Sequence, residues 1–323
     1  MRAWLGVFVL ALGACGSTAS TSPDKDSPVT IAFAGDVHTA DPVDPTDPAY
    51  AGAFQQLREA DVAMVNLETA VATSGTPADK RFLFRADPAI LDKLASWGVD
   101  LVTMANNHAL DYGRDGLEET LLARDDANLG VLGVGRTADQ ALSPAQITVR
   151  GSTITFLAAK LDDDPTADPT AAWAATKTLS GVASASDPAA LLAGVERHSD
   201  RGAVVVFLHW GIQGDFCPNA EQVDLAAALR RAGADVIIGA HSHTIQSMGQ
   251  VGDGFVAYGL GNFMWWRQSP KATPDGGVLT VTLDGETVTD ARWTPHVRDT
   301  DRSAPRARPG QAANSPLATS CQE

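Results

Sequence analysis

Cysteine is scarce in this chain, which has only 3 cysteines among its 323 residues. They are Cys15, Cys217 and Cys321, and no two of them form a Cys-x-x-Cys pair, which argues against thiol redox catalysis. If the protein is exported and Cys15 is set aside, the remaining pair predicts one disulfide, which ties the C-terminal tail to the loop after Trp210. Two free thiols are the alternative.

Basic residues are also few, since 24 Lys and Arg stand against 39 Asp and Glu and give a formal net charge of −15. Apart from a loose group at residues 292–308, no run of basic residues occurs. Proteins that bind nucleic acid neutralise phosphates with basic patches. The composition therefore predicts no nucleic-acid partner and disfavours an extracellular nuclease.

The N-terminus lacks an apolar stretch long enough to span a membrane, because the apolar run after Arg2 covers only residues 4–12. This layout is that of a secretory signal peptide. The closing Leu-Gly-Ala-Cys resembles a bacterial lipobox, which would make Cys15 the lipid-carrying first mature residue. An ordinary signal peptide with a coincidental cysteine is the alternative. We expect a lipoprotein signal peptide (1–14), a flexible tether (15–28) and a protein exported to the outer face of the cell membrane.

The rest of the chain is rich in short β-branched runs that alternate with helical patterns. Buried strands are predicted at residues 29–34, 61–66, 99–104, 203–208 and 234–238, and helices at 49–60, 88–98, 113–128, 187–199 and 222–232. Residues 147–149 and 153–159 predict a hairpin. Strands at 255–258, 277–283 and 287–293 follow without helices, which predicts a second, largely antiparallel sheet stacked on the first.

Polar side chains follow five of these strands at the point where each strand ends. They are Asp36 and His38, Glu68, Asn107 and His108, His209, and His241 and His243. Residues at i and i+2 on extended backbone point to the same side, and the strand ends of a parallel sheet meet at the crevice that binds ligands. Carboxylate, imidazole and amide oxygen together suit a pair of divalent metal ions. Taken singly, a strand-end Asp or Asn is more often a helix cap and a lone His a surface residue.

The order Gly-Asp-x-His, Asn-His, a lone His and Gly-x-His-x-His is similar to that of the calcineurin-like binuclear metallophosphoesterases. Residues 34–37, 65–69, 105–113, 209–211, 232–243 and 258–263 resemble more closely the CapA family of poly-γ-glutamate capsule biosynthesis proteins. The resemblance implies a metallophosphatase-like α/β-β/α sandwich of two stacked sheets flanked by helices. That domain would cover residues 29–297, followed by an extended tail at 298–323.

The resemblance also implies roles for the strand-end residues. One metal would be held by Asp36, His38 and His243, the other by Asn107, His209 and His241, and Glu68 would bridge them. His108 would be the acid beside the leaving group, oriented by Asp111 because no acidic residue follows the Asn-His pair directly. The bridging position is Asp in phosphoesterases and Glu68 here, which leaves the metal spacing and the choice among Mn, Fe, Zn and Mg open.

Two divalent ions beside two carboxylates would leave a local charge of about +2, so the site would accept phosphate or the carboxylates of poly-glutamate. We therefore expect a surface protein of capsule biogenesis whose metal-activated water attacks a phosphoester or an amide, with membrane-bound polymer synthase subunits as partners. The alternative is a non-catalytic module that binds or tethers anionic polymer through a structural or vestigial metal site. Arg85, Trp210 and Asn262 are further candidates for substrate contact, against an exposed strand, core packing and a turn cap.

Overall fold

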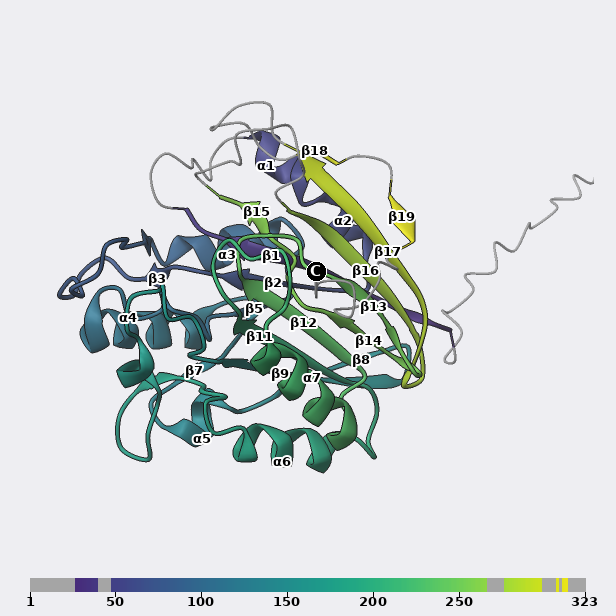
Figure 1. The fold of residues 1–323 in the computed structure, drawn as a ribbon. Helices are drawn as coiled ribbons and strands as arrows, with labels where there is room; N and C mark the ends of the chain where they lie inside the picture. The colour runs from purple at the N-terminus through teal and green to yellow at the C-terminus, as the bar shows by residue number, and fades with distance from the viewer. Residues whose placement is uncertain (1–26, 40–47, 266–275, 298–305, 308–309, 313–323) are drawn as a thin grey trace, which may run out of the picture.

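The computed structural model of the chain describes residues 27–39, 48–265, 276–297, 306–307 and 310–312 (Figure 1). The predicted signal peptide and most of the predicted tether lie outside these ranges. Two multi-stranded sheets lie in the middle of the molecule, and helices cover their outer faces. The predicted architecture of two stacked sheets flanked by helices is confirmed.

The first sheet is built around the N-terminal strand. Its order is β18 (Arg306–Ala307), β17 (Thr287–Val297), β16 (Gly276–Asp284), β1 (Val29–Val37), β2 (Val62–Leu67), β5 (Leu101–Thr103) and β6 (Gly130–Leu132). In addition, β15 (Asn262–Met264) pairs with β1, and β19 (Gln311–Ala312) pairs with β17. The strands β1, β2, β5 and β6 run parallel, whereas β16 and β17 form an antiparallel hairpin on the other side of β1.

The second sheet comes from the middle of the chain. Its order is β13 (Met248–Val251), β14 (Gly254–Ala257), β12 (Val236–His241), β11 (Val204–Trp210), β9 (Ser152–Lys160) and β8 (Ala145–Val149). Two short pairs complete the strands, β3 (Ala70–Val71) with β4 (Arg85–Ala86) and β7 (Val134–Gly135) with β10 (Gly181–Val182).

The helices divide between the two outer faces. They are α1 (Pro48–Ala53), α2 (Gln55–Glu59), α3 (Ala89–Ser96), α4 (Gly113–Asp126), α5 (Ala138–Ala141), α6 (Ala189–His198) and α7 (Ala220–Ala232), with a 3₁₀ turn η1 at Ala171–Trp173. The predicted helix at residues 49–60 is therefore two short helices that meet at Phe54. An Asn219 capping box begins α7, and Gly233 ends it with φ of +102°. None of the described helices is both long and apolar enough to cross a membrane.

Alternation along β1 explains the layering. Ile31 and Phe33 belong to the apolar cluster that β1 shares with the second sheet, whereas Ala32 and Ala34 belong to the cluster that contains Leu57 of α2. One face of the first sheet therefore packs on the second sheet and the other on helices. Figure 1 shows α6 and α7 on the outer face of the second sheet.

The sequence-based division of the strands into sheets was wrong. We predicted that the strands after residue 250 form a sheet of their own, but β14 joins β12 and the β16–β17 hairpin joins β1. The strands β11 and β12, predicted beside β1, lie in the other sheet. An apolar run identifies a buried strand, but the run does not determine which strand lies beside it.

Candidate metal centre

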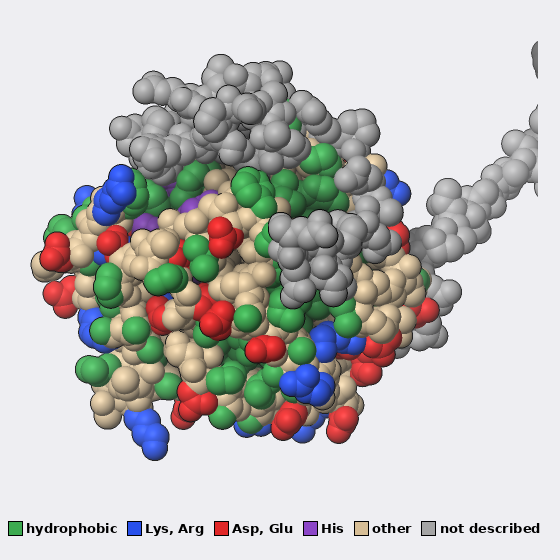
Figure 2. All heavy atoms as spheres, in the orientation of Figure 1, with side chains coloured by type: hydrophobic (Ala, Val, Ile, Leu, Met, Phe, Trp, Pro, Cys, Tyr) green, Lys and Arg blue, Asp and Glu red, His purple; other side chains and the backbone are tan. Residues whose placement is uncertain are grey.

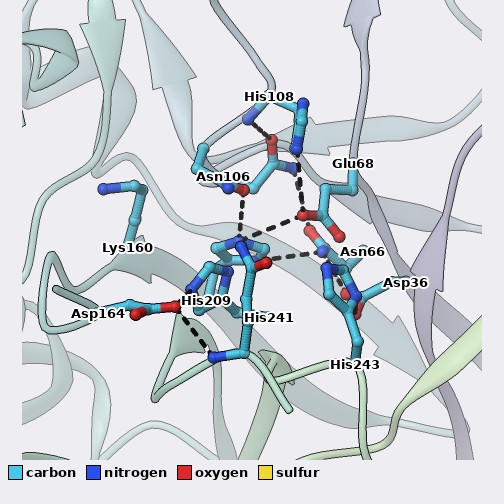
Figure 3. A network of polar contacts seen from close by, with 12 residues as sticks. Asp36, Asn66, Glu68, Asn106, His108, Lys160, Asp164, His209, His241 and His243 are labelled. Atoms are coloured by element: carbon cyan, nitrogen blue, oxygen red, sulfur yellow. Dashed lines mark hydrogen bonds and ion pairs between the residues drawn. The ribbon is translucent and has the colours of Figure 1, made fainter. Parts of the chain in front are cut away.

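The carboxyl ends of parallel strands from both sheets meet at one place. Asp36 lies in β1 and Glu68 directly follows β2, while His209 lies near the end of β11 and His241 ends β12. Figure 3 shows these side chains pointing toward a common centre. Gly35 helps to form it, because a Cβ there would collide with the carbonyl oxygen of Gly261, which accepts the Asp36 amide at 3.0 Å.

Two groups of three potential metal ligands lie in this centre, and Glu68 belongs to both. Asp36, Glu68 and His243 form the first group, and Glu68, His209 and His241 form the second. In each group, one ligand atom from every residue lies within 4.8 Å of the other two. Carboxylate oxygen and imidazole nitrogen are donors that divalent transition metals accept. These side chains, of which only His243 is partly exposed, can therefore bind a metal ion.

Glu68 is the least satisfied residue of the centre. It is fully buried, and neither carboxylate oxygen has a hydrogen-bond partner among the described residues. Burial, reinforced by the neighbouring charge of Asp36, raises the pKa of the Glu68 carboxyl well above its ordinary value. A buried carboxylate without donors is unfavourable unless a cation compensates it. The donor set of the centre thus fits a metal ion.

The spacing of the two histidines at the end of β12 predicts continuous extended backbone, but the structure differs. Both have left-handed φ values, +92° at His241 and +56° at His243, which L-residues adopt rarely. Their ring centroids are 6.2 Å apart. His241 reaches the group with His209, and His243 reaches the group with Asp36. Backbone strain of this kind persists where the surrounding structure requires it, often at functional sites.

His241 is oriented by a carboxylate that lies outside both ligand groups. Its Nε2 lies 3.3 Å from Asp164 Oδ2, and its buried Nδ1 has no hydrogen-bond partner in the part of the chain that the structure describes. Burial raises the pKa of the Asp164 carboxyl, but hydrogen bonds from His241, Thr166 and the Gln213 amide outweigh it and hold that pKa well below its ordinary value. An ionised Asp164 keeps the proton on Nε2, so Nδ1 presents its lone pair.

His209 is held between two amide side chains. Its Nε2 lies 2.9 Å from Asn107 Oδ1 and 3.6 Å from Glu68 Oε1. Its Nδ1 lies 3.2 Å from the Asn66 Nδ2, which also donates to Asp36 Oδ1 at 2.8 Å. Burial lowers the pKa of the His209 imidazole well below its ordinary value. The ring is therefore neutral near pH 7, the form that binds metals.

His108 sits beside the centre in a chain of charged contacts. Its Nε2 lies 3.9 Å from Glu68 Oε1, and its Nδ1 lies 2.6 Å from Asp111 Oδ2, so the predicted contact with Asp111 is present. The other oxygen of Asp111 accepts from Lys80 Nζ at 2.6 Å. Burial lowers the pKa of His108 to about 4, although Asp111 opposes this shift. Phe84 stacks on the imidazole with centroids 4.2 Å apart.

Comparison with known proteins places the chain in a family. Residues 30–265 match the family of bacterial capsule synthesis proteins PGA_cap. The chain belongs to this family. The predicted CapA resemblance is thereby confirmed.

Named relatives of this PGA_cap chain come from several bacteria. It is 28% identical to the capsule biosynthesis protein CapA of Bacillus anthracis, over 83% of this chain and 69% of that protein. It is 32% identical to the PGA biosynthesis protein CapA of Bacillus subtilis (strain 168), over 60% of this chain and 51% of that protein. A probable polyglutamine synthesis accessory protein of Mycobacterium tuberculosis is 30% identical over 57% of this chain and 50% of that protein. The chain thus spans about half the length of the latter two relatives.

Two solved structures align with most of the chain. A hypothetical protein from Thermus thermophilus aligns with a TM-score of 0.49 and 17% identity, over 86% of this chain and 98% of that one. The Haemophilus influenzae NAD nucleotidase NadN aligns with a TM-score of 0.49 and 14% identity, over 88% of this chain and 54% of that one.

Two predicted ligands of the PGA_cap chain, His38 and Asn107, lie outside both ligand groups. His38 is fully buried, stacks on Phe84 with centroids 4.5 Å apart and meets Trp265 edge-on at 4.3 Å. Its predicted role as a metal ligand remains a prediction. Asn107 Oδ1 lies 2.9 Å from His209 Nε2, and its predicted role as a metal ligand also remains a prediction.

The three predicted substrate contacts have different surroundings. Asn262 Oδ1 lies 2.9 Å from His243 Nδ1, so this residue borders the first ligand group. Trp210 is fully buried and its Nε1 donates to the Tyr258 carbonyl, so its predicted groove role was wrong and it is a core residue. Arg85 is exposed and lies over the Tyr112 ring at 4.4 Å.

The predicted cysteine roles fall largely outside the described residues. Cys217 is disulfide-bonded, but Cys321 and the lipidation candidate Cys15 lie outside the described ranges. The pairing of Cys217 with Cys321 therefore remains a prediction.

Sequence reasoning missed several polar residues of the centre. They are Asn66, Lys80, Asn106, Lys160 and Asp164. Asn66 and Asn106 precede predicted site residues closely, and their amides link β2 to the loop after β5 at 3.1 Å. Position in a predicted strand end was thus an available signal for these two. Lys80 and Asp164 lie in loops, and no periodic pattern predicts which way a loop folds.

Proposed function

We propose that this protein is a metal-dependent hydrolase that acts on an anionic polymer, or on a phosphorylated precursor, during capsule or poly-glutamate biogenesis. The single observation that carries the proposal is the position of Glu68. Its buried carboxylate has no hydrogen-bond donor within the described ranges and belongs to both groups of potential ligands.

The ligand groups suggest a pair of divalent ions. Asp36, Glu68 and His243 would hold one ion, and Glu68, His209 and His241 would hold the other. When bound, such a pair supplies a Lewis acid that polarises the attacked group and lowers the pKa of a water molecule.

The chain's own residues would manage the proton. Asp111 would keep the imidazole of His108 oriented through Nδ1, and Lys80 would fix Asp111 in turn. His108 would exchange a proton with the leaving group at Nε2. Because burial lowers its pKa to about 4, the ring is neutral at pH 7 in the metal-free protein, so it would take a proton from solvent before donating it to the leaving group.

The polymer is inferred from the relatives. Two of them are named for capsule or PGA biosynthesis and another is named a probable polyglutamine synthesis accessory protein. We extend this accessory role to the present chain and propose that it works with the synthesis machinery of such a polymer. Its residues 30–265 carry the family match and include every member of both ligand groups.

Metal content and turnover test the proposal directly. Protein loaded with Mn²⁺ or Zn²⁺ and then dialysed should retain two ions per chain by mass spectrometry. Fewer than one ion per chain, unchanged in His241→Ala, would reject the metal centre. A screen over aryl phosphates and γ-glutamyl amides, with Asp36→Asn as the inactive control, should then identify the bond that is cleaved.

A non-catalytic binding or tethering module is the second candidate function. It is favoured by the glutamate at the position that we expected to bridge the metals, where phosphoesterases use aspartate, and by the net charge of −15. Metal-dependent turnover that is lost in both Asp36→Asn and His108→Ala would argue against it.

We also propose that the protein is exported and anchored through a lipid on Cys15. The supporting observation is the Leu-Gly-Ala-Cys tetrad that closes the N-terminal apolar run. In a bacterial host, the wild type should fractionate with membranes and Cys15→Ala should not. Equal membrane association of both proteins would contradict the anchor.

A further inference from the structure

A cleft of about 240 Å³ opens beside the second ligand group. Its lining joins Asn107, His209 and His241 to residues 160–162, 164–165 and 167–171, which follow β9. The volume equals that of about eight water molecules in the liquid, so the cleft suits one residue-sized chemical group. Figure 3 shows Lys160 and Asp164 on the side of His209 away from Asp36. Histidine side chains are visible from outside on the face drawn in Figure 2.

Three consecutive aspartates fasten the loop that forms the outer wall of this cleft. Asp162 contacts the Lys160 ammonium and accepts from Thr170 Oγ1 at 3.1 Å. Asp163 accepts from the Gly211 amide at 3.0 Å, and Asp164 accepts from the Gln213 amide at 2.9 Å. The loop is therefore tied to its own base and to the segment after β11, so the wall is preorganised.

Lys160 is the basic side chain of the cleft; burial lowers its pKa to about 7, which the nearby carboxylate of Asp163 opposes, so the ammonium form is present at and below neutral pH. Lys160 is the last residue of β9, lies in register with His209 and has only 3% of its surface exposed. No other Lys or Arg occurs among the described residues that line the cleft. An ammonium group has three N–H donors, and Asp162 is the acceptor for Lys160 among the described residues. Donors thus remain for a ligand.

The carboxylates of the cleft, in contrast, already have donors. Asp162 has Lys160 and Thr170, Asp164 has His241, and Asp168 accepts from the Arg81 amide at 3.0 Å. The hydrogen-bonding groups that remain available in the cleft are therefore mainly the N–H donors of Lys160. A buried ammonium with spare donors favours an anionic oxygen as its ligand.

We propose that this cleft is a subsite for an anionic oxygen of the substrate and that Lys160 binds this oxygen. The inference rests on the proposed function, because the cleft adjoins ligands of the second metal group. A polymer carboxylate and a phosphate share the required chemistry. A structural salt bridge that only holds the loop is the competing role for Lys160.

Calorimetric titration of the purified, Mn²⁺-loaded full chain tests the proposal with two probes, γ-L-glutamyl-L-glutamate and inorganic phosphate. Lys160→Met should weaken binding of at least one probe by about tenfold or more, since a hydrogen bond to a charged group is lost. The probe that depends on Lys160 identifies the source of the anion. Lys177→Met, at an exposed lysine, is the matched control and should bind as the wild type does.

Asp162→Asn separates ligand binding from loop support. If Lys160 binds the ligand, removing its competing carboxylate should preserve or tighten binding. If the salt bridge is structural only, Asp162→Asn should weaken binding as much as Lys160→Met, which would overturn the proposal. Unchanged binding in Lys160→Met, or no binding of either probe to the wild type, would overturn it too.

Folding and metal content keep the outcomes distinct. If Lys160→Met unfolds, Lys160→Arg retains the charge and should keep binding within a few-fold, and Asp162→Asn still decides between the two roles. Metal content of each variant is measured in parallel. Wild-type protein that binds no metal would contradict the proposed function. Metal-loaded protein that binds the probes equally well with and without Lys160 would contradict only the subsite.

Discussion

Replacing Glu68 by Gln should stabilise the metal-free protein and remove its stabilisation by metal. In the folded chain the carboxylate is buried without a donor, and its pKa is raised above the ordinary value of 4.5 by burial first and by Asp36 second. A raised folded pKa means that the metal-free wild type loses stability as the pH rises above 4.5, up to the folded pKa. Glu68→Gln lacks this loss, so its advantage should grow with pH.

The expected size follows from two terms. An unsatisfied buried polar group costs about 1–3 kcal/mol, and because the amide keeps the shape but not the charge, we expect a gain of about 1–2 kcal/mol at pH 8. Metal at one hundred times its dissociation constant should stabilise the wild type by about 2.7 kcal/mol. For a domain of this size that is a rise in Tm of roughly 5–11 °C, and for Glu68→Gln a rise near zero.

Thermal unfolding with chelator and with Mn²⁺ or Zn²⁺, at pH 6 and pH 8, measures both terms. Glu59→Gln is the matched control, because Glu59 is exposed on α2, and it should respond to metal like the wild type. Two results would refute the reasoning. One is a metal-free Glu68→Gln protein that is no more stable than the wild type at pH 8. The other is an undiminished rise in Tm when metal is added to this variant.

Asp164→Asn should weaken metal binding by about 10–100-fold in a chelator competition assay, because His241 loses the partner that fixes its proton. Equal affinity would exclude this orienting role. Gly239→Ala should destabilise the fold by about 1–3 kcal/mol in urea unfolding, because its Cβ would collide with backbone and indole atoms, whereas Gly52→Ala meets open space and should not destabilise it. Burial lowers the pKa of His296 to about 4, so the neutral folded ring contributes stability above pH 6.5 that is lost as the pH falls toward 4, by about 3 kcal/mol. His296→Gln should flatten that part of a stability–pH curve, and a curve identical to the wild type's would show that His296 does not titrate in this way.

Secondary structure and the meeting of the strand ends were largely predictable from the sequence. The run before Asp36 and the run before Glu68 are short, apolar and β-branched, so each could only be a buried strand. Because parallel strands end on one edge, the polar residue after each run had to lie near the others. His209 and His241 come from the other sheet, so their place beside Asp36 and Glu68 depends on how the two sheets stack, which the strand-end pattern does not predict.

Residues whose position depends on loops could not be predicted in the same way. Asp164 and Lys80 lie in loops, outside any helical or strand pattern in the sequence. The left-handed backbone at His241 and His243 results from packing rather than from residue type. For Trp210 the strand was predicted, but the surroundings of the side chain were not. By sequence a tryptophan at a strand end is more often a core residue than a groove residue, and the complete burial of Trp210 and its contact with the Tyr258 carbonyl decide for the core.

The central place of β1 has a consequence for the order of folding. Asp36 pairs on one side with Asn66 of β2 and on the other with Asn262 of β15, and β16 closes the rest of that edge. A ligand near the beginning of the chain, Asp36, is therefore fully enclosed only with strands that are made some two hundred residues later. A growing chain that stops before β16 leaves β1 with an open edge, which is a template for pairing with other chains. We therefore expect β1 and Asp36 to be fully enclosed only once segments from both ends of the domain have been made.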